Sequence, residues 1–319
     1  TYLLFLLIVP LLSLPAQSSS QEKWKLQPID SNHIFQDPDY FHWGGSVLKT
    51  PDGLYHLFYS RWKKEYSFYG WLTHSEVAHA ISNKPFGPWT YIETVLTGLG
   101  PGYWDGITAH NPKIKHFDGK YYLYYISTHL DSKDYTDEDL IQTAAVGYEH
   151  PNWKILRPNQ RTGVAVADRI TGPWRRQEQP MIEPSGPITT LTVNPAITRG
   201  HDGQYYLIVK GDKPNESRFI RNQALAIGQE PTGPWQVLDQ AVIDTLDTED
   251  MSLWFDPEQQ RYYGVFHAHT SIGMISSGDG IHWEPEQALT HKILQFADGT
   301  TIEPQRMERP FVSVSYTHL

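Results

Sequence analysis

The sequence predicts an all-β fold, a five-bladed β-propeller of four-stranded antiparallel blades in which the last blade is incomplete. Three observations support this prediction. A strand–turn–strand pattern recurs along the chain, a Gly-Pro-Trp turn follows most copies of it, and aromatic residues make up 13% of the sequence against 19% charged residues. Such a composition is typical of turn-rich β proteins rather than helical ones.

The recurring pattern is a β-hairpin whose second strand carries aromatic residues. The second strands read GLYHLFYS (53–60), GKYYLYYIS (119–127), GQYYLIVKG (203–211) and QRYYGVFHA (260–268). An Asp-Gly or Asp-Pro turn precedes each of them, and Gly tolerates the positive φ of a tight hairpin turn. Both faces of residues 119–127 are apolar or aromatic, as expected where a sheet is packed on two sides. The expected first strands begin near Trp43, His110, Val193, Glu249 and, in a fifth unit, Glu308.

A tryptophan follows the third strand in four of these units. In each unit a small residue stands seven positions before the Trp, and in three of them the Trp ends a Gly-Pro-Trp turn. We interpret this repeated Trp as a packing wedge between neighbouring blades rather than as a platform for a ligand. A β-sandwich with a similar number of strands is the alternative fold, but it does not explain the constant offset. The four residues are Trp89, Trp174, Trp235 and Trp283.

The two ends of the chain predict a leader and a truncation. Residues 1–20 read as a signal peptide and linker, because the apolar run from Leu3 to Leu14 is too short to span a membrane and a Ser/Gln-rich stretch follows it. Residues 21–319 then form the propeller domain. Only seven residues follow ERPFV (308–312), so we expect this domain to be truncated at its C-terminus. A secreted or periplasmic protein is predicted, with no membrane contact once the signal is removed.

The bulk composition excludes several kinds of partner and chemistry. A formal net charge of −10 argues against nucleic acid, because phosphate binding needs a basic surface. The chain has no cysteine, which excludes thiol catalysis, disulfides and cysteine-ligated zinc. The sequence gives no basis for an oligomeric state.

The residues at the starts of the expected innermost strands are polar, where a filled β core would need Val or Ile. In a propeller these positions converge on a central channel. Carboxylates with interleaved Trp and His suit the binding and cleavage of a sugar, since hydroxyl groups need polar partners and glycosidic cleavage needs two carboxyl groups with different pKa values. The candidates are Asp39, Trp43, Trp104, Asp105, His110, Asn111, Asn194, Glu249, Asp250, Glu308 and Arg309.

The Asp-Gly-Lys-Tyr-Tyr-Leu-Tyr-Tyr strand, the Gly-Pro-Trp turns and the acidic inner strands resemble the five-bladed propeller glycosidases. These are glycoside hydrolase families 43 and 117 and their relatives, including the phosphorylases of family 130. The resemblance covers about residues 30 to 312. It implies an Asp of blade one as base or nucleophile, an Asp of a middle blade that tunes pKa values, and a later Glu as the acid. Glu249 in TEDMSLW matches the acid position, with Asp250 beside it.

The other two positions depart from the family pattern. Blade one has Gly44-Gly45 where the family writes Asp-Pro, so its nearest carboxylates are Asp37 and Asp39. Blade three has Asn194 where an Asp is common, and Asp105 could supply a carboxylate from another direction. The predicted catalytic residues are therefore Glu249, Asp105, Asp250 and Asp39. The predicted substrate-binding residues are Trp43, Trp104, His110, Asn111, Asn194, His267, His269, Glu308 and Arg309.

Each carboxylate also has a purely structural interpretation. Asp105 could cap a turn after Trp104, Asp250 could accept backbone hydrogen bonds at a strand entry, and Glu308 with Arg309 could form an ion pair in the channel wall. His267 and His269 alternate along a strand and share a face, so with Asp250 they could bind a metal or act as an acid. No cofactor is required and no catalytic metal is predicted, although the resemblance allows a structural calcium or sodium ion in the channel.

The leading functional hypothesis is an exported, exo-acting glycoside hydrolase that releases a terminal sugar from a plant- or algal-type oligosaccharide. The resemblance favours an inverting mechanism. A phosphorylase of the same fold is one alternative, with phosphate held by Arg309, His110 and Arg61. A non-catalytic carbohydrate-binding propeller is the other, although the polar residues differ from blade to blade and so indicate one asymmetric site.

Overall fold

A computed structural model describes residues 26–130 and 135–313. The predicted signal peptide and the last six residues of the chain lie outside the described residues. Within them, no helix has the length and apolar character needed to cross a membrane.

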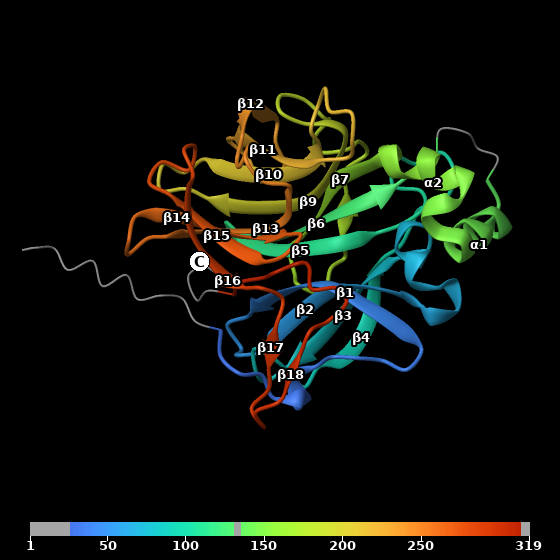
Figure 1. Cartoon of the computed structure of the whole chain (residues 1–319), viewed down its shortest axis with the longest axis horizontal. Coiled ribbons are helices and arrows are strands. Elements are labelled where there is room, and N and C mark those ends of the chain that lie inside the picture. Colours follow the sequence, from blue (N-terminus) through green and yellow to red (C-terminus); the bar gives the residue numbers. More distant parts are fainter. Residues whose placement is uncertain (1–25, 131–134, 314–319) are drawn as a thin grey trace, which may run out of the picture.

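The described part of the chain contains four four-stranded antiparallel sheets and one two-stranded sheet. Their first strands β1, β5, β9 and β13 lie toward the middle of the molecule, as a propeller requires (Figure 1). Blade one consists of β1 (Tyr40–Lys49), β2 (Tyr55–Lys63), β3 (Glu76–Ser82) and β4 (Thr90–Leu96). Blade two consists of β5 (His110–Phe117), β6 (Lys120–Thr128), β7 (Gln160–Ala167) and β8 (Arg175–Arg176). Blade three consists of β9 (Thr189–Arg199), β10 (Tyr205–Asp212), β11 (Arg221–Gly228) and β12 (Trp235–Ala241). Blade four consists of β13 (Thr248–Asp256), β14 (Arg261–Ala268), β15 (Ile272–Ser277) and β16 (Glu284–Thr290).

The fifth sheet is the hairpin β17 (Leu294–Gln295) and β18 (Thr301–Ile302). Residue 29, near the start of the described chain, pairs beside it through a parallel bridge between Ile29 and Phe296. The all-β propeller of four-stranded blades is thus confirmed, with four blades and a partial fifth sheet. The helices are α1 (Asp137–Val146) and α2 (Pro151–Leu156), with 3-10 helices η1 (Ser31–His33), η2 (Lys64–Tyr66), η3 (Phe68–Leu72), η4 (Gly147–Glu149) and η5 (Arg157–Asn159).

Every innermost strand carries a β-bulge at the same place. In β1, for example, Trp43 pairs with Ser60 but Ser46 pairs with Phe58, so the inner strand has one extra residue. The same shift occurs in β5, β9 and β13. One residue in each bulge has a positive φ, and an equivalent residue precedes the fifth unit's Pro310. These residues are Gly44 (60°), Asn111 (53°), Asn194 (58°), Asp250 (66°) and Arg309 (61°).

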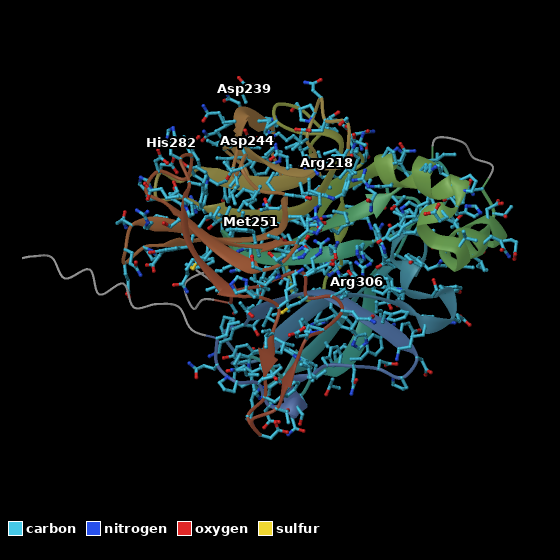
Figure 2. The ribbon with its side chains drawn as sticks, in the orientation of Figure 1. Arg218, Asp239, Asp244, Met251, His282 and Arg306 are labelled. Atoms are coloured by element: carbon cyan, nitrogen blue, oxygen red, sulfur yellow. The ribbon has the colours of Figure 1, made fainter. Side chains whose placement is uncertain are left out.

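This shared bulge bends the start of each inner strand and places polar side chains at one end of the channel. Beyond the bulge, apolar residues fill the space between blades. Figure 2 shows Met251 near the middle of the molecule, where its side chain is fully buried, and Asp239 and His282 at the outer edge.

Three of the four repeated tryptophans pack between blades, as the sequence predicts, whereas Trp89 packs against its own blade and Phe35. Trp174, which follows the third strand of blade two, meets Phe58 of blade one edge-on with ring centroids 5.8 Å apart. Trp235 and Trp283 likewise join apolar clusters that contain residues of their own blade and of the preceding one. The tryptophan turn is therefore a structural wedge.

We expect the substitution Trp174→Ala to lower the free energy of unfolding by about 2 kcal/mol, less than the cost of deleting a fully buried Trp because the side chain is half-buried. Chemical denaturation measures this change. The exposed Phe86, changed to Ala, is the matched control and should have little effect. Equal effects of the two substitutions would contradict the wedge.

The sequence prediction did not include two α-helices between β6 and β7. A capping box between Thr136 and Asp139 starts α1, and Pro151 stands in the first turn of α2, where its missing N–H costs nothing. Their apolar residues pack against Leu72 of blade one, and Leu140 and Trp153 are buried in this cluster. The helices thus extend one side of the propeller, on the right of Figure 1, and supply one wall of the site described next.

Candidate active site

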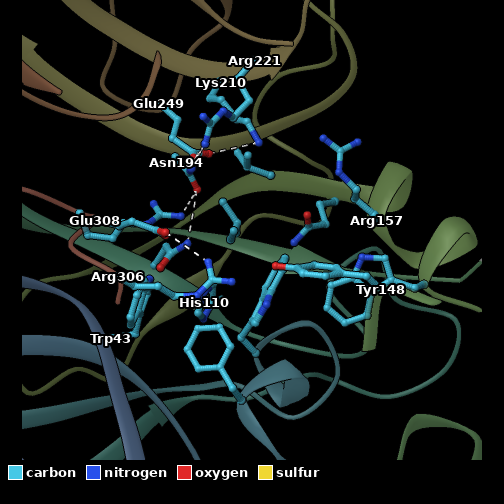
Figure 3. A pocket seen from close by; sticks show the side chains of 18 of the residues that line it. Trp43, His110, Tyr148, Arg157, Asn194, Lys210, Arg221, Glu249, Arg306 and Glu308 are labelled. Atoms are coloured by element: carbon cyan, nitrogen blue, oxygen red, sulfur yellow. Dashed lines mark hydrogen bonds and ion pairs between the residues drawn. The ribbon is translucent and has the colours of Figure 1, made fainter. Parts of the chain in front are cut away.

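A cavity of about 560 Å³ lies at the end of the channel where the bulges converge (Figure 3). This volume is within the range of small-ligand sites. Blades one to four, the helical insertion and the segment 306–309 all contribute to it. The lining residues are Trp43, Trp62, Phe68, Trp71, His110, Asn111, Ile126, Tyr148, Trp153, Arg157, Gln160, Val193, Asn194, Lys210, Phe219, Arg221, Glu249, Arg306, Glu308 and Arg309.

One wall of the cavity is aromatic. Trp71 stacks on His110 with ring centroids 5.6 Å apart, and Trp153 from the helical insertion meets Trp71 edge-on at 5.4 Å. Phe68 meets Trp43 edge-on at 5.7 Å. These rings support one another, so they present a preformed apolar surface of the kind on which sugar rings stack.

The floor of the cavity is a buried polar network that links three blade entries. Asn194 Nδ2 donates to Asp250 Oδ1 at 2.7 Å, and Asn194 Oδ1 accepts from Arg309 Nη2 at 2.6 Å. The Arg309 guanidinium also pairs with Asp250, with Nε 3.3 Å from Oδ1, and the Arg309 backbone N–H donates to Asp250 Oδ2 at 3.2 Å. Blades three and four and the fifth unit are therefore tied together at the channel mouth.

Glu249 lies at the cationic side of the cavity. Figure 3 shows it beside Lys210 and Arg221, and its carboxylate pairs with Arg221 Nη1 and lies 3.4 Å from Lys210 Nζ. Burial alone would raise the pKa of Glu249, but Lys210, His267, Arg221 and Arg309 outweigh burial and hold this pKa well below its ordinary value. Glu249 is therefore ionised at neutral pH.

Asp250 differs from its neighbour in position and in the direction in which its pKa is shifted. Its side chain is 1% exposed and does not line the cavity. Burial is the largest influence on the pKa of Asp250 and raises it, with Glu249 acting in the same direction and Arg309 opposing. Asp250 is thus a structural and electrostatic group beneath the site, which fits the sequence's alternative interpretation of it.

Glu308 is the second carboxylate among the described residues that line the cavity. Its side chain is 20% exposed, and Arg306 Nη1 lies 3.3 Å from its Oε1. Arg306 in turn lies over the ring of Phe68, 4.9 Å from the centroid. Glu308 was predicted as a substrate-binding residue, and its place in the cavity makes it a candidate for the chemistry as well.

His110 contributes a neutral imidazole to the site. Burial, assisted by Arg309, lowers the pKa of His110 well below its usual value. Its Nδ1 lies 2.7 Å from Ser75 Oγ, a hydrogen bond that fixes the ring against Trp71.

The structure brings most of the predicted residues together. Trp43, His110, Asn111, Asn194, Glu249, Glu308 and Arg309 line the cavity. Beneath them, His267 Nδ1 lies 3.6 Å from carboxylate oxygens of both Glu249 and Asp250.

Four predicted residues lie elsewhere. Asp105 accepts hydrogen bonds from Arg176 Nη1 and Tyr125 Oη, each at 2.8 Å, so it is a buried partner of blade two and not a cavity carboxylate. Trp104 donates to the Gln177 carbonyl at 3.0 Å. Asp39 is exposed, and His269 is 73% exposed beside Asp247. None of these four lines the cavity.

The missing carboxylate of blade one has a physical cause. Gly44 has a φ of 60°, and a Cβ atom there would lie 2.6 Å from the side-chain amide of Asn111. Asn111 thus occupies the space that a side chain at position 44 would need. Among the described residues that line the cavity, blade one contributes aromatic side chains, Trp43 among them, but no acid or base.

Sequence reasoning included Arg309 but missed the other four basic residues that line the cavity, above all Lys210 and Arg221. Lys210 is 7% exposed in a strand of buried apolar residues, GQYYLIVKG. A lysine in such a run is a signal that could have been read, because burying an ammonium group is costly unless it has a partner. Arg157, Trp62 and Trp71 gave no comparable signal.

The three groups Glu249, Asp250 and His267 lie close enough to hold a metal ion. They do not suit one, because protein cations already occupy their free sides. Arg221 and Lys210 contact Glu249, Arg309 contacts Asp250, and Lys292 Nζ lies 2.7 Å from His267 Nε2. The channel below the cavity does not suit a cation either, because two lysines, Lys113 and Lys115, are buried there.

These two lysines extend from β5 across the channel. Lys113 Nζ lies 5.1 Å from the ring of Phe311, and Lys115 Nζ lies 3.5 Å from the Leu253 carbonyl oxygen of β13. Burial lowers the pKa of Lys113 to about 7 and that of Lys115 to about 8. Lysine side chains of the chain itself therefore lie in the channel where the sequence resemblance allows a structural cation.

The buried Lys115 predicts a rise in stability with pH. Its folded-state pKa, about 8, lies below that of an exposed lysine, so the unfolded chain binds more protons between about pH 8 and pH 10. In that window the free energy of unfolding should rise by up to about 1.4 kcal/mol per pH unit relative to the variant Lys115→Met. Denaturation at several pH values measures this, with the exposed Lys120→Met as control; parallel pH profiles for Lys115→Met and the unsubstituted protein would contradict it.

Comparison with known proteins finds similarity at the level of structure. No protein-family model and no curated protein matches the sequence. A family 117 glycoside hydrolase of the marine bacterium Zobellia galactanivorans matches with a TM-score of 0.60 at 17% identity, over 86% of this chain and 78% of the other. An endo-arabinase from Bacteroides thetaiotaomicron matches with a TM-score of 0.52 at 12% identity, over 86% and 90%.

A GH43 enzyme from Xanthomonas citri, solved with xylotriose, matches with a TM-score of 0.51 at 16% identity over 79% of this chain and 75% of the other. At these identities the matches show the fold. The predicted resemblance to propeller glycosidases of families 43 and 117 is thus confirmed for the architecture.

Proposed function

We propose that this protein is a glycoside hydrolase whose active site is the cavity at the mouth of the propeller channel. The observation that carries the proposal is that Glu249 and Glu308 share one cavity with a wall of aromatic rings. Glycosidic cleavage by the common route needs two carboxyl groups, and aromatic rings are the usual platform for sugars. The fold shared with glycoside hydrolases of several families supports the same reaction by analogy.

The electrostatics favour roles that differ from those implied by the sequence resemblance. Because the neighbouring cations hold its pKa well below the ordinary value, Glu249 is ionised and cannot donate a proton, so of the two cavity carboxylates it is the one left to act as the base. Glu308 is then the group that protonates the leaving oxygen. We propose an inverting reaction on this basis, in which a water molecule lies between Glu249 and the sugar.

The filled channel supports exo-action. Lys113 and Lys115 are buried in the channel below the cavity, with Lys113 Nζ 5.1 Å from the ring of Phe311, and this supports entry of a glycan from the outer side of the cavity. We propose that the enzyme releases a terminal sugar from a plant- or algal-type oligosaccharide.

Two broader features are proposals as well. Five equivalent positive-φ positions, from Gly44 to Arg309, support a five-bladed propeller over residues 21–319. The apolar run Leu3 to Leu14 supports export to the periplasm or the medium. Expression of the leader fused to a reporter, followed by cell fractionation, tests export; a reporter retained in the cytoplasm would contradict it.

A hydrolysis screen tests the proposed function. Purified protein is incubated with aryl glycosides and with agar-, carrageenan- and arabinan-derived oligosaccharides, with and without inorganic phosphate. We expect one monosaccharide to be released without phosphate. Release that requires phosphate would identify a phosphorylase instead, for which Arg309 and His110 line the cavity but Arg61 does not, since it pairs with Glu76 on blade one. Binding without cleavage would identify a carbohydrate-binding propeller.

A further inference from the structure

The charge on the cavity wall is opposite in sign to that of the whole chain. Although the formal net charge is −10, the described residues that line the cavity carry two acidic side chains, Glu249 and Glu308, against five basic ones. The five are Arg157, Lys210, Arg221, Arg306 and Arg309.

The carboxylates that balance some of these cations lie behind the cavity wall. Asp212 holds Arg157 through two hydrogen bonds of 2.8 and 2.6 Å, and Asp247 holds Arg221 Nε. Neither aspartate lines the cavity, so basic groups face a ligand while their acidic partners do not.

Two of the cations flank an exposed aromatic side chain at the rim. The guanidinium carbon of Arg157 lies 4.4 Å from the centroid of the Phe219 ring, and Lys210 Nζ lies 5.7 Å from the same ring. Phe219 itself is 57% exposed. The two bonds to Asp212 use two of the five N–H groups of Arg157, and the closest ion-pair contact of Lys210, to Glu249, is 3.4 Å long. Both basic side chains therefore keep donor capacity for a ligand.

The side chains that remain free to form hydrogen bonds in the cavity favour a ligand that accepts hydrogen bonds. In the cavity floor, Asn194 Oδ1 is already taken by Arg309 Nη2, and the Glu249 carboxylate is shared by Arg221 and Lys210. Arginine and lysine side chains can only donate. A neutral sugar offers hydroxyl groups that donate and accept, whereas an oxyanion only accepts and gains from the positive charge.

We propose that the sugar bound in this cavity carries an oxyanion substituent, a uronate carboxylate or a sulfate ester, which lies between Arg157 and Lys210 beside Phe219. This inference rests on the proposed function for the reaction but not for the binding. Phe219 covers the pair from the rim, and its low polarity strengthens the interaction of the basic groups with the bound anion.

Binding of paired ligands tests the inference. Calorimetry or protein-observed NMR compares methyl galacturonide with methyl galactoside, and galactose 6-sulfate with galactose, at low and high salt. We expect the anionic member of at least one pair to bind about tenfold more tightly, with the advantage shrinking as salt rises. The two pairs distinguish carboxylate from sulfate.

Two variants locate the anion. Arg157→Gln and Lys210→Met should each bring the affinity for the anionic ligand down toward that of its neutral partner. The control Arg175→Gln removes an exposed arginine outside the cavity and should change nothing. Thermal melting of each variant shows whether it is folded. Because the two substitutions are independent, the test remains valid if one of the variants does not fold.

The remaining outcomes distinguish a failure of this inference from a failure of the proposed function. No preference for anionic ligands, or a preference that survives in both variants, would overturn the inference. Inorganic phosphate that competes at the same residues and is consumed in the reaction would also overturn it, since the cations would then hold a free co-substrate. Anionic ligands that bind as expected but are never hydrolysed in oligosaccharides would leave the inference standing and overturn the proposed hydrolase.

Discussion

The substitution Glu249→Gln should reduce the turnover number about 10²–10⁴-fold, the range lost when a general base is removed. The amide keeps the size of the side chain but lacks the negative charge that Lys210 and Arg221 stabilise, so it cannot take a proton from water. The measurement is the rate of sugar release from the best substrate of the screen. The KM should change less than the turnover number, because the variant retains the aromatic wall.

The control for this prediction lies on the same blade. Glu284→Gln makes the same chemical change on β16, where the side chain is 76% exposed and pairs with Arg261 away from the cavity. Its activity should equal that of the unsubstituted enzyme. Glu308→Gln should be impaired mainly on substrates with poor leaving groups, as expected for a proton donor. Full activity of Glu249→Gln would contradict the assignment of the base.

The second large effect concerns stability. The substitution Asp250→Asn should lower the free energy of unfolding by about 3 kcal/mol, because it leaves the buried Arg309 guanidinium without its countercharge. The Asp250 side chain is 1% exposed and that of Arg309 12%, so water cannot replace the lost partner well. Asn tolerates the positive φ of 66° at this position, so the substitution tests charge rather than backbone strain.

A double-mutant cycle isolates the pair. Arg309→Met alone should also destabilise the protein, while Asp250→Asn combined with Arg309→Met should cost less than the sum of the two by about 2 kcal/mol. Denaturant unfolding of the four proteins measures the coupling. Additive effects would show that Asp250 and Arg309 act independently and that the network does not tie the fifth unit to blade four.

The blade pattern could be predicted because it depends on local rules. The hairpin around Asp118-Gly119 and the wedge of Trp174 follow from turn geometry and from a repeated packing need, and both recur along one chain. Residues such as Asn194 at a bulge, and Arg309 at the equivalent position of the fifth unit, could be identified as site residues for the same reason, since the repeat places each one at an equivalent position.

The other site residues could not be predicted, because their positions depend on contacts between segments that are distant in the sequence. Asp105 precedes an inner strand just as a site residue would, but Arg176, 71 residues later, draws it into blade two. Conversely, Lys210 and Arg221 lie on β10 and β11, the second and third strands of blade three, and they contact Glu249 of the next blade. The role that we propose for Glu249, a base in place of the acid that the resemblance implies, follows from these cations, and of the two only Lys210, within its apolar run, left a signal in the sequence.

The most direct test of the central claim is a crystal structure of the Glu249→Gln variant with an oligosaccharide that the unsubstituted enzyme cleaves. The account predicts that the terminal sugar lies in the cavity against Trp71 and Trp43, with the intact glycosidic oxygen next to Glu308 and the anomeric carbon facing position 249. An oligosaccharide bound elsewhere on the propeller, or one in the cavity with its glycosidic bond out of reach of both side chains, would contradict the claim that this cavity is the active site.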